Sequence, residues 1–423
     1  MRSVEEQQAR VTAAAMAPRP IRVAIAEAQG LMCAEEVVTE RPMPGFDQAA
    51  IDGYAVRSVD VLGIGGIGAD PEETSAPAAG EVTLPVIGSI EAGTRTPARL
   101  QPRQAARVQT GAPMPTLADA VLPLRWTDGG ESRVRVLRGV RSGAYVRRAG
   151  DDVQPGDVAV RAGTIIGAAQ VGLLAAVGRE RVLVHPRPRI AVLSVGGELV
   201  DISRTPGNGQ VYDVNSYALA AAARDAGAEV NRVGIVDSEP TKLREVVESQ
   251  LGRSEIVVIA GAVGGAAAEA VRAVLSELGE MEVARIAMHP GSVQGFGQLG
   301  EEGVPTFLLP ANPVSALVVF EVMVRPLIRL SLGKRQPMRR VVQARALSPI
   351  SSVAGRTGYL RGQLMRDQDT DEYLVQALGG MPGESSHLLA TLAEANCLVV
   401  VPSDVEQVRT GETVDVAFLA QRG

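Results

Sequence analysis

The segment Glu255–Gly279 has the spacing of an anion-binding unit. Five apolar residues, Ile256–Ala260, predict a buried parallel strand, the run GAVGG at 261–265 permits a tight turn, and Ala266–Leu278 has helical spacing and high helix propensity. Such a unit directs unpaired backbone N–H groups toward the strand end, where a phosphate or another anion can bind. A glycine loop alone is a weak signal, and by itself this segment is more typical of an ordinary turn between a strand and a helix.

Four further segments place polar residues in turns or at strand ends. Asp52 precedes a glycine in AAIDGYA, and Thr110 begins TGAPMP, which is followed by Asp119. Glu198 follows two glycines after an apolar run, and Asn312 lies between two prolines that fix the loop LPANPVS. Taken singly, each is more typical of a turn than of a site, because an aspartate in a turn usually caps its own backbone.

Strands that alternate with helices are predicted between residues 186 and 332. Outside Glu255–Gly279, the predicted strands are 189–195, 229–236 and 304–309, and the predicted helices are 215–226, 241–251 and 313–332. This alternation indicates a parallel α/β sheet whose ligand site lies at the carboxyl ends of the strands. The strand-end motifs are therefore expected to meet at one edge of that sheet.

The rest of the chain predicts three further parts, so the fold class is α/β plus β in several domains. Residues 45–150 are rich in short strand-like runs separated by Gly and Pro and predict a β-rich domain. Helical patterns at 4–15, 24–33 and 168–177 suggest that residues 1–44 and 151–185 form one discontinuous helical domain that links the others. Alternating strand-like runs predict a small β domain at 333–423.

Length and composition exclude several classes of protein. A chain of 423 residues is long enough for two to four domains, and apolar runs such as Ala316–Val324 fall short of the roughly 20 residues that a membrane span needs. The first 20 residues lack the apolar core of a secretion signal, so a cytoplasmic protein without membrane insertion is expected. A net charge of −6, with one Trp and five Phe, argues against nucleic-acid binding. Cys33 and Cys397 lie too far apart for a metal or redox motif.

Taken together, in this order, the motifs resemble the molybdopterin molybdenumtransferase family, which includes bacterial MoeA proteins and the C-terminal domain of gephyrin. The likeness covers essentially the whole chain. Besides Glu255–Gly279, it includes RPMPGFDQAAIDGYAV (41–56), TGAPMPTLADAVLP (110–123), RRAGDDVQPGD (147–157), GNGQVYDVNSYAL (207–219) and GESSHLLATLAEANCLVVVP (383–402).

The resemblance implies an elongated homodimer of four-part subunits. In it, 186–332 is a MogA-like α/β domain that binds molybdopterin, and 333–423 is a β domain resembling a barrel. The cleft of the α/β domain is completed by the DGYA-bearing domain, 45–150, of the partner subunit.

The family's reaction brings together adenylylated molybdopterin and molybdate, hydrolyses the phosphoanhydride with release of AMP, and transfers molybdenum to the dithiolene. Mg²⁺, which prefers oxygen ligands and keeps several waters, would bridge the phosphates. Carried over to this chain, the resemblance implies catalytic roles for Asp52, Thr110, Asp152, Glu198 and Glu269, of which Asp52, Glu198 and Glu269 would hold the metal. Substrate-binding roles fall on Gly261, Gly264, Gly265, His289, Gly291, Ser292, Pro310, Asn312, Pro313 and Ser386.

Several positions depart from the family pattern. The loop SGGVSVGxxD of the family corresponds to Ala260–Glu269, which lacks both hydroxyls, and KPGKP corresponds to HPGSV at 289–293, which lacks both lysines. An acid that follows the second strand in the family is shifted here to Asp237 or Glu239. Since a charge-assisted hydrogen bond contributes on the order of 1.5–3 kcal/mol, these losses would weaken anion binding by orders of magnitude. His289 would replace part of the lost positive charge only if its pKa were raised.

Two functions from different classes are therefore open. In the first, the chain inserts molybdate into adenylylated molybdopterin as a Mg²⁺-dependent transferase. In the second, it is a catalytically weakened, gephyrin-like dimeric scaffold that binds the peptide tail of a cell-division tubulin homologue or of a membrane receptor. The breadth of the family favours the enzyme, and the pocket losses favour the scaffold.

Overall fold

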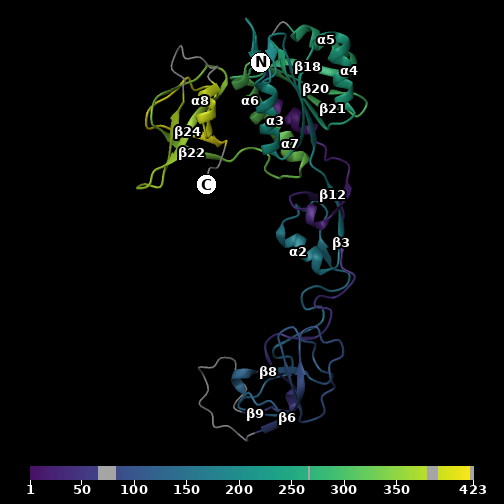
Figure 1. Cartoon of the computed structure of the whole chain (residues 1–423). Coiled ribbons are helices and arrows are strands. Elements are labelled where there is room, and N and C mark those ends of the chain that lie inside the picture. The colour runs from purple at the N-terminus through teal and green to yellow at the C-terminus, as the bar shows by residue number, and fades with distance from the viewer. Residues whose placement is uncertain (65–81, 265–266, 379–388, 420–423) are drawn as a thin grey trace. The chain divides into compact units, whose positions relative to one another are not determined.

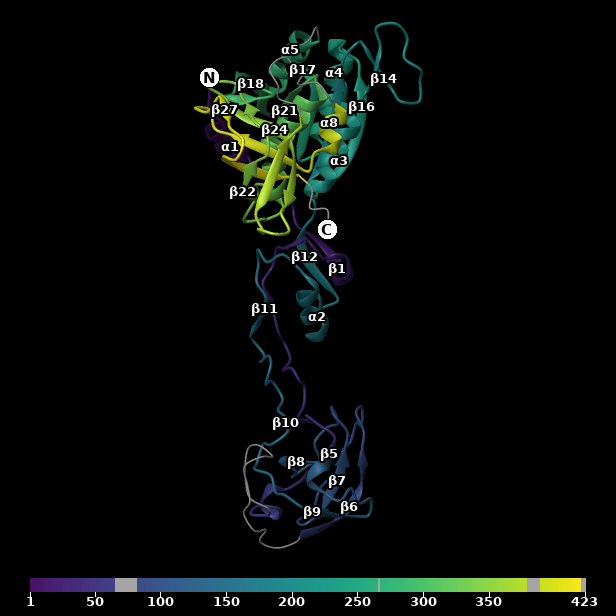
Figure 2. The same ribbon diagram turned by 90° about the vertical axis from the view of Figure 1, so that its left-hand side faces the viewer.

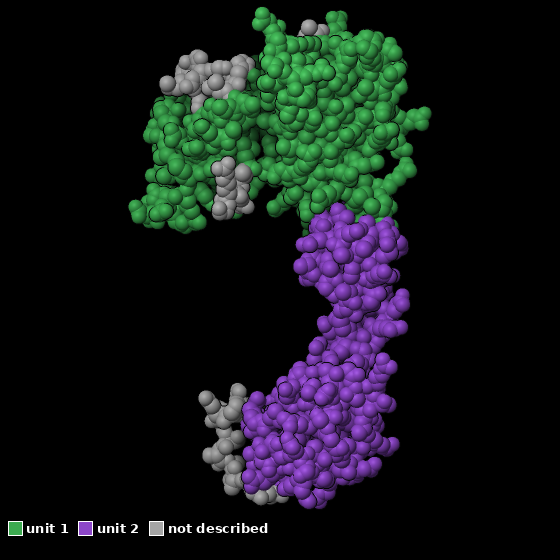
Figure 3. Space-filling view, in the orientation of Figure 1, with its two compact units in different colours: residues 1–21, 183–423 green, residues 22–182 purple. Residues whose placement is uncertain are grey.

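The computed structural model describes residues 1–64, 82–264, 267–378 and 389–419, and its chain forms two compact units. Unit 1 comprises residues 1–21 and 183–423, and unit 2 comprises residues 22–182 (Figure 3). The chain passes from one unit to the other within β1 (Ile21–Ala24) and within β12 (Arg181–His185). The finer division into four domains stays a prediction.

Unit 1 is built on a six-stranded sheet with the order β16-β13-β17-β21-β20-β18. Its strands are β13 (Arg189–Val195), β16 (Glu229–Val236), β17 (Ile256–Val263), β18 (Gly279–Arg285), β20 (Val293–Leu299) and β21 (Val304–Pro310). The first four strands in this order are parallel, as predicted, and β20 and β18 extend the sheet as an antiparallel edge. Every residue of β17 is buried, which explains its continuous apolar sequence.

Helices cover both faces of this sheet (Figure 1). One face carries α3 (Asn215–Ala226), α6 (Pro313–Val319), a π-helical turn at Phe320–Val324 (η4) and α7 (Arg325–Ser331), and the other carries α4 (Pro240–Leu251) and α5 (Ala268–Leu278). The predicted helix 313–332 is therefore three successive helical segments.

The N-terminal helix differs from its predicted placement. Helix α1 (Val4–Ala13) buries Val4, Gln7 and Val11, and the two valines join the core formed by α3, α6 and α7. The predicted discontinuous domain placed this helix with residues 151–185. The buried residues at three- and four-residue spacing form one helix face, and the apolar surface of unit 1 covers it.

Unit 2 contains the predicted β-rich part as a five-stranded sheet with the order β8-β5-β7-β6-β9. Its strands are β5 (Gly53–Val56), β6 (Val82–Ile90), β7 (Ala105–Val108), β8 (Ala120–Pro123) and β9 (Arg133–Val136). The 3₁₀ turns η2 (Ser58–Asp60) and η3 (Leu124–Trp126) follow β5 and β8.

The segments before and after this sheet pair with each other. The pairing strands are β3 (Val37–Val38) with β11 (Val158–Val160) and β4 (Gln48–Ala49) with β10 (Val146–Arg147), and α2 (Ala168–Ala176) follows. The predicted helix at 24–33 is wrong, because this segment ends β1, makes a 3₁₀ turn at Ile25–Glu27 (η1) and continues as β2 (Met32–Cys33). The backbone N–H of Cys33 donates to the carbonyl of Thr164 at 2.8 Å, so tertiary pairing outweighs the helix propensity of the local alanines.

The C-terminal part is a closed barrel, which confirms the predicted β domain. Its strands follow the order β24-β25-β22-β28-β26, and β26 pairs back to β24. They are β22 (Val341–Ala346), β24 (Thr357–Arg366), β25 (Tyr373–Ala377), β26 (Cys397–Val401) and β28 (Thr413–Phe418). The short elements β19 (Met288–His289), β23 (Ile350–Ser351), α8 (Leu389–Glu394) and β27 (Gln407–Val408) accompany them.

Candidate functional site

The strand order places a topological switch point between β13 and β17. The connection from β13 leads through α3 to β16 on one side, whereas β17 lies on the other side and leads into α5. Open α/β sheets bind ligands at the carboxyl ends of strands where the order reverses in this way. Described parts of three predicted segments lie at these ends: 196–198 after β13, Gly264 and 267–269 after β17, and 311–313 after β21.

Strand β17 runs further than the sequence suggested, so Gly261 and Ala262 belong to the strand and not to the loop. Gly261 has φ +82°, and a Cβ there would lie 2.1 Å from the carbonyl oxygen of Val195. The close approach of β13 and β17 therefore requires glycine at this position. Gly264 has φ +78°, and a Cβ there would meet no atom of the described residues within 4 Å; Gly265 lies outside the described residues.

The two predicted acids of this edge are exposed. The Glu198 carboxylate folds back over Gly196, where a Cβ would lie 2.7 Å from Glu198 Oε2. Glu269 lies in the first turn of α5. Glu198 follows β13 and Glu269 follows β17, so they flank the switch point from its two sides.

The shifted acids after β16 have local partners. Asp237 Oδ2 pairs with Lys242 Nζ at 3.0 Å, and Glu239 accepts hydrogen bonds from the backbone N–H groups of Thr241 and Lys242 at the start of α4. These contacts lower the pKa of both carboxyls. Glu239 therefore caps α4, and Asp237 forms an ion pair with the first turn of that helix.

A buried network behind the same edge was missed by the sequence analysis. Asp213 is only 1% exposed and accepts hydrogen bonds from Ser194 Oγ (2.8 Å), Ser216 N (3.0 Å) and Ser216 Oγ (2.5 Å). Arg232 Nη1 donates to Ser216 Oγ at 3.1 Å. The network ties the end of β13 to the start of α3, and its only sequence signal is an aspartate three residues before a serine at a helix start.

The same segment holds the loop after β21. Asn215 is 6% exposed, and its Nδ2 donates to the carbonyl of Ala311 at 2.8 Å. Asn312, predicted to bind substrate, caps α6 through Oδ1, which accepts from Ser315 N at 3.0 Å. The prolines Pro310 and Pro313 flank this anchored loop.

The loop at 289–292 is fixed between two elements. His289 pairs with Gly358 where β19 joins β24, and a Cβ on Gly291 would lie 2.3 Å from Val319 Cγ2. Burial lowers the pKa of His289, and the charge of Arg356 lowers it further. A raised pKa was the condition for a positive charge on His289, and the lowered pKa does not meet it. Ser292 is half-buried, and its carbonyl accepts from Ile286 N.

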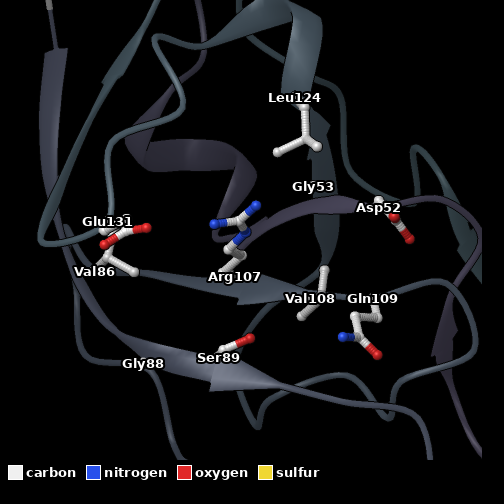
Figure 4. A pocket seen from close by; sticks show the side chains of 10 residues that line it. All are labelled: Asp52, Gly53, Val86, Gly88, Ser89, Arg107, Val108, Gln109, Leu124 and Glu131. Carbon is white, nitrogen blue, oxygen red and sulfur yellow. The ribbon is translucent and has the colours of Figure 1, made fainter.

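Unit 2 carries Asp52 and Thr110 together. Thr110 donates to Asp52 Oδ1 from its backbone N–H at 2.7 Å and from Oγ1 at 2.8 Å, and these bonds lower the pKa of Asp52. Asp52 also lines a pocket of about 390 Å³ (Figure 4). Asp152, in the same unit, is exposed, and its backbone N–H donates to the carbonyl of Met43; its carboxylate makes no hydrogen bond to Asp52 or Thr110 in the described structure.

Comparisons with known proteins agree over the length of the chain. Three family models match in succession: the MoeA N-terminal region (domain I and II) at residues 2–178, a probable molybdopterin binding domain at 191–330, and the MoeA C-terminal region (domain IV) at 343–419. Molybdopterin molybdenumtransferase 1 of Mycobacterium tuberculosis H37Rv is 83% identical over 426 residues, which cover 100% of both chains. The chain belongs to the molybdopterin molybdenumtransferase family.

Two further matches agree with this assignment. Molybdopterin molybdenumtransferase 2 of the same strain is 36% identical over 98% of this chain and 99% of its own. The crystal structure of a molybdopterin biosynthesis MoeA protein from Pyrococcus horikosii covers 98% of both chains with a TM-score of 0.80 and 30% identity. The predicted family, fold and class of transferase in molybdenum cofactor biosynthesis are confirmed, and the scaffold alternative finds no support in these matches.

The family is established for this molybdopterin molybdenumtransferase homologue, and the roles of the individual site residues stay predictions. Among the residues that the structure describes, no group of three or more His, Cys, Asp and Glu side chains is arranged to hold a metal. Asp52 nevertheless fits one role in Mg²⁺ binding, because its Oδ2 accepts no hydrogen bond within the described residues and Mg²⁺ in phosphate sites often uses only one or two carboxylates. Ser386 lies outside the described residues.

No helix within the described ranges has the length and apolar character needed to cross a membrane. Strand β14 (Leu199–Val200) directly follows Glu198, and the loop between β14 and β15 (Val211–Tyr212) extends from unit 1 (Figure 2).

Proposed function

We propose that this chain inserts molybdate into adenylylated molybdopterin, with release of AMP and with Asp52 as the central catalytic carboxylate. The observation that carries the proposal is the Asp52–Thr110 pair, in which two hydrogen bonds orient an ionised carboxylate and leave Oδ2 available. The full-length similarity to molybdopterin molybdenumtransferase 1 supports the substrate class.

The carboxyl edge of the unit 1 sheet would bind the pterin and its dithiolene. Gly261, Gly264, Gly291 and Ser292, with the loop 310–313, supply mainly backbone donors and acceptors there. An anionic substrate would rely on backbone N–H groups, since the loop at 289–293 contains no Lys or Arg.

In the hydrolytic step, water attacks the phosphorus of the adenylyl group, and the P–O bond to the molybdopterin phosphate breaks. AMP leaves, and molybdopterin keeps its own phosphate. In the transfer step, two Mo–S bonds form to the dithiolene and one Mo–O bond of molybdate breaks. The displaced oxygen leaves as one water with the two protons of the dithiol. Asp52 would orient the attacking water or hold Mg²⁺, which neutralises phosphate charge when bound.

Thr110, Asp152, Glu198 and Glu269 complete the proposed catalytic set. Glu198 and Glu269 flank the switch point, where a carboxylate would contact a substrate-bound cation. We further propose a homodimer in the cytoplasm, in which the partner subunit completes the cleft. The family resemblance supports this assembly.

Genetic rescue tests the proposal. A bacterial strain that lacks its own molybdenumtransferase should regain nitrate reductase activity when it expresses this chain. Asp52→Ala should not rescue, although it accumulates to the wild-type level. Failure of the wild-type chain to rescue, at normal expression, would refute the proposed function.

A further inference from the structure

The carboxylate of Glu198 makes no hydrogen bond to any residue that the structure describes, so the backbone sets where it lies. Residues 211–216 hold that backbone. Val211 N donates to the carbonyl of Glu198, and Asp213 N donates to the carbonyl of Val200, both at 2.9 Å. The position of this carboxylate at the switch point therefore depends on how residues 211–216 are fixed.

The buried side chain of Asp213 fixes these residues to the centre of the sheet. It accepts from Ser194 Oγ at 2.8 Å, and Ser194 pairs with Ile235 of β16 on one side and Ala260 of β17 on the other. It also accepts from the backbone N–H and the hydroxyl of Ser216 in α3. A helix cap needs neither burial nor a bond to a neighbouring strand. The contact with Ser194 is therefore a constraint beyond the capping of α3.

Strand β16 adds Arg232 to this network through a β-bulge. The register between β13 and β16 shifts here, and Val233 is an extra residue opposite β13. Gly234 has φ +85°, and a Cβ there would lie 3.1 Å from Arg232 Nη1. Bulges of this kind redirect a side chain and are frequent beside active sites. Here the redirected Arg232 Nη1 donates to Ser216 Oγ at 3.1 Å.

The same arginine extends the network to the far side of Glu198. The guanidinium of Arg232 lies over the ring of Tyr217, 3.9 Å from its centroid, and the Tyr217 hydroxyl donates to Asp201 Oδ2 at 3.3 Å. Asp201 directly follows β14. The network therefore holds the chain before Glu198, at Ser194, and after it, at Asp201.

We propose that Asp213 and Arg232 are positioning residues for Glu198. They fix the backbone on both sides of this glutamate, so that its carboxylate stays at the switch point without a hydrogen-bond partner of its own. The inference rests on the proposed function, which gives Glu198 its catalytic role, and it adds two residues that act through Glu198.

A double-mutant cycle on the full-length protein tests this role, with turnover of adenylylated molybdopterin as the measurement. Ser194→Ala, Asp213→Asn and Arg232→Gln should each lower kcat about 10- to 100-fold and keep KM within about threefold of the wild type, because a small displacement of a catalytic group has effects of this size. In a Glu198→Gln background the same changes should lower kcat less than about twofold, because no carboxylate remains to be positioned.

Thr306→Val is the matched control for Ser194→Ala. The Thr306 side chain is as fully buried in the same sheet, and its hydroxyl donates to the carbonyl of Val304 in its own strand at 3.1 Å. This variant should keep the kcat of the wild type in both backgrounds.

A nitroxide label on Glu198→Cys measures the positioning without turnover. The native cysteines Cys33 and Cys397 are buried, so the new thiol can be labelled selectively. Adding Asp213→Asn should increase the mobility of this label in the electron paramagnetic resonance spectrum. A label on Glu248→Cys, an exposed position of α4, should keep its mobility.

The inference is overturned if Asp213→Asn lowers kcat by the same factor in the Glu198→Gln background as in the wild type, or if it leaves the mobility of the label at 198 unchanged. Either result would reduce Asp213 to a structural cap of α3. Where Asp213→Asn does not fold, Ser194→Ala carries the same comparisons. A wild type without turnover refutes the proposed function alone, because the label tests the positioning separately.

Discussion

Asp52 Oδ1 accepts both the backbone N–H and the hydroxyl of Thr110, at 2.7 and 2.8 Å. Pairing of Gly53 with Val108 across β5 and β7 brings the two residues together, although 58 positions separate them in the chain. Both hydrogen bonds favour the charged form of the carboxyl, because N–H and O–H groups donate to a carboxylate. The pair therefore keeps Asp52 ionised and fixes its orientation.

Thr110→Val should shift the acid limb of activity to higher pH. The variant keeps the backbone hydrogen bond and loses the hydroxyl, so the pKa of Asp52 rises part of the way to its ordinary value. A carboxyl with a lowered pKa is ionised until the pH falls through that pKa, so the variant loses its ionised Asp52 earlier on acidification. The pH profile of AMP release measures this shift. Thr116→Val, which changes an exposed threonine with no contact to Asp52, should leave the profile unchanged.

His289 should be neutral at neutral pH. Burial lowers its pKa below the ordinary value of 6.5, and Arg356 contributes to the shift. As the pH falls through 6.5 toward this lowered pKa, the unfolded chain binds a proton before the folded one does, so this residue lowers the stability of the fold on acidification. NMR titration of the ring should give a pKa below 6.5 in the wild type and a higher one in Arg356→Gln. Equal pKa values of His289 in the two proteins would show that Arg356 does not contribute to the lowered pKa.

Asn215→Ala should raise KM for adenylylated molybdopterin about tenfold and change kcat less. The variant releases the Ala311 carbonyl, so the loop 310–313 loses its anchor to α3. Loss of one buried hydrogen bond costs about 1 kcal/mol of stability. Asn231→Ala is the matched control, because Asn231 Nδ2 donates to Gln250 Oε1 at 2.8 Å, away from this loop. A similar rise in KM in both variants would reduce the role of Asn215 to general stability.

Gly261→Ala should lower the free energy of unfolding much more than Gly264→Ala does. Ala at 261 places Cβ 2.1 Å from the Val195 carbonyl oxygen and should cost more than about 4 kcal/mol or prevent folding. In Gly264→Ala, the new Cβ meets no atom of the described residues within 4 Å, and the positive φ alone should cost about 1 kcal/mol. Denaturant unfolding of the two variants gives the comparison. Equal losses would show that β13 and β17 do not approach as closely at this point.

Local sequence patterns were sufficient to predict most helices and strands of the α/β part. The helix Asn215–Ala226 and the strands Arg189–Val195 and Glu229–Val236 have their predicted bounds, because apolar periodicity there agrees with burial. The helix prediction for 24–33 failed because the backbone partners of this segment come from residues after 160, beyond the range of any local pattern.

The site was predictable only in part. Asp52 and Thr110 were found through motif resemblance, and their hydrogen bonds follow from the pairing of β5 and β7. The role of Asn215 could not be derived, because its partner Ala311 lies 96 residues away. Arg107 and Glu131, which line the pocket beside Asp52, gave no signal in the sequence, because only the folded sheet brings these residues together.

The most direct test of the central claim is turnover of adenylylated molybdopterin by purified full-length protein. AMP release and molybdenum insertion are measured with and without molybdate and Mg²⁺, in the wild type and in Asp52→Ala. The wild type should release AMP and insert molybdenum with dependence on both ions, and Asp52→Ala should bind the substrate with less than about 1% of the turnover. A wild type without turnover, or an Asp52→Ala variant that keeps full activity, would contradict the account.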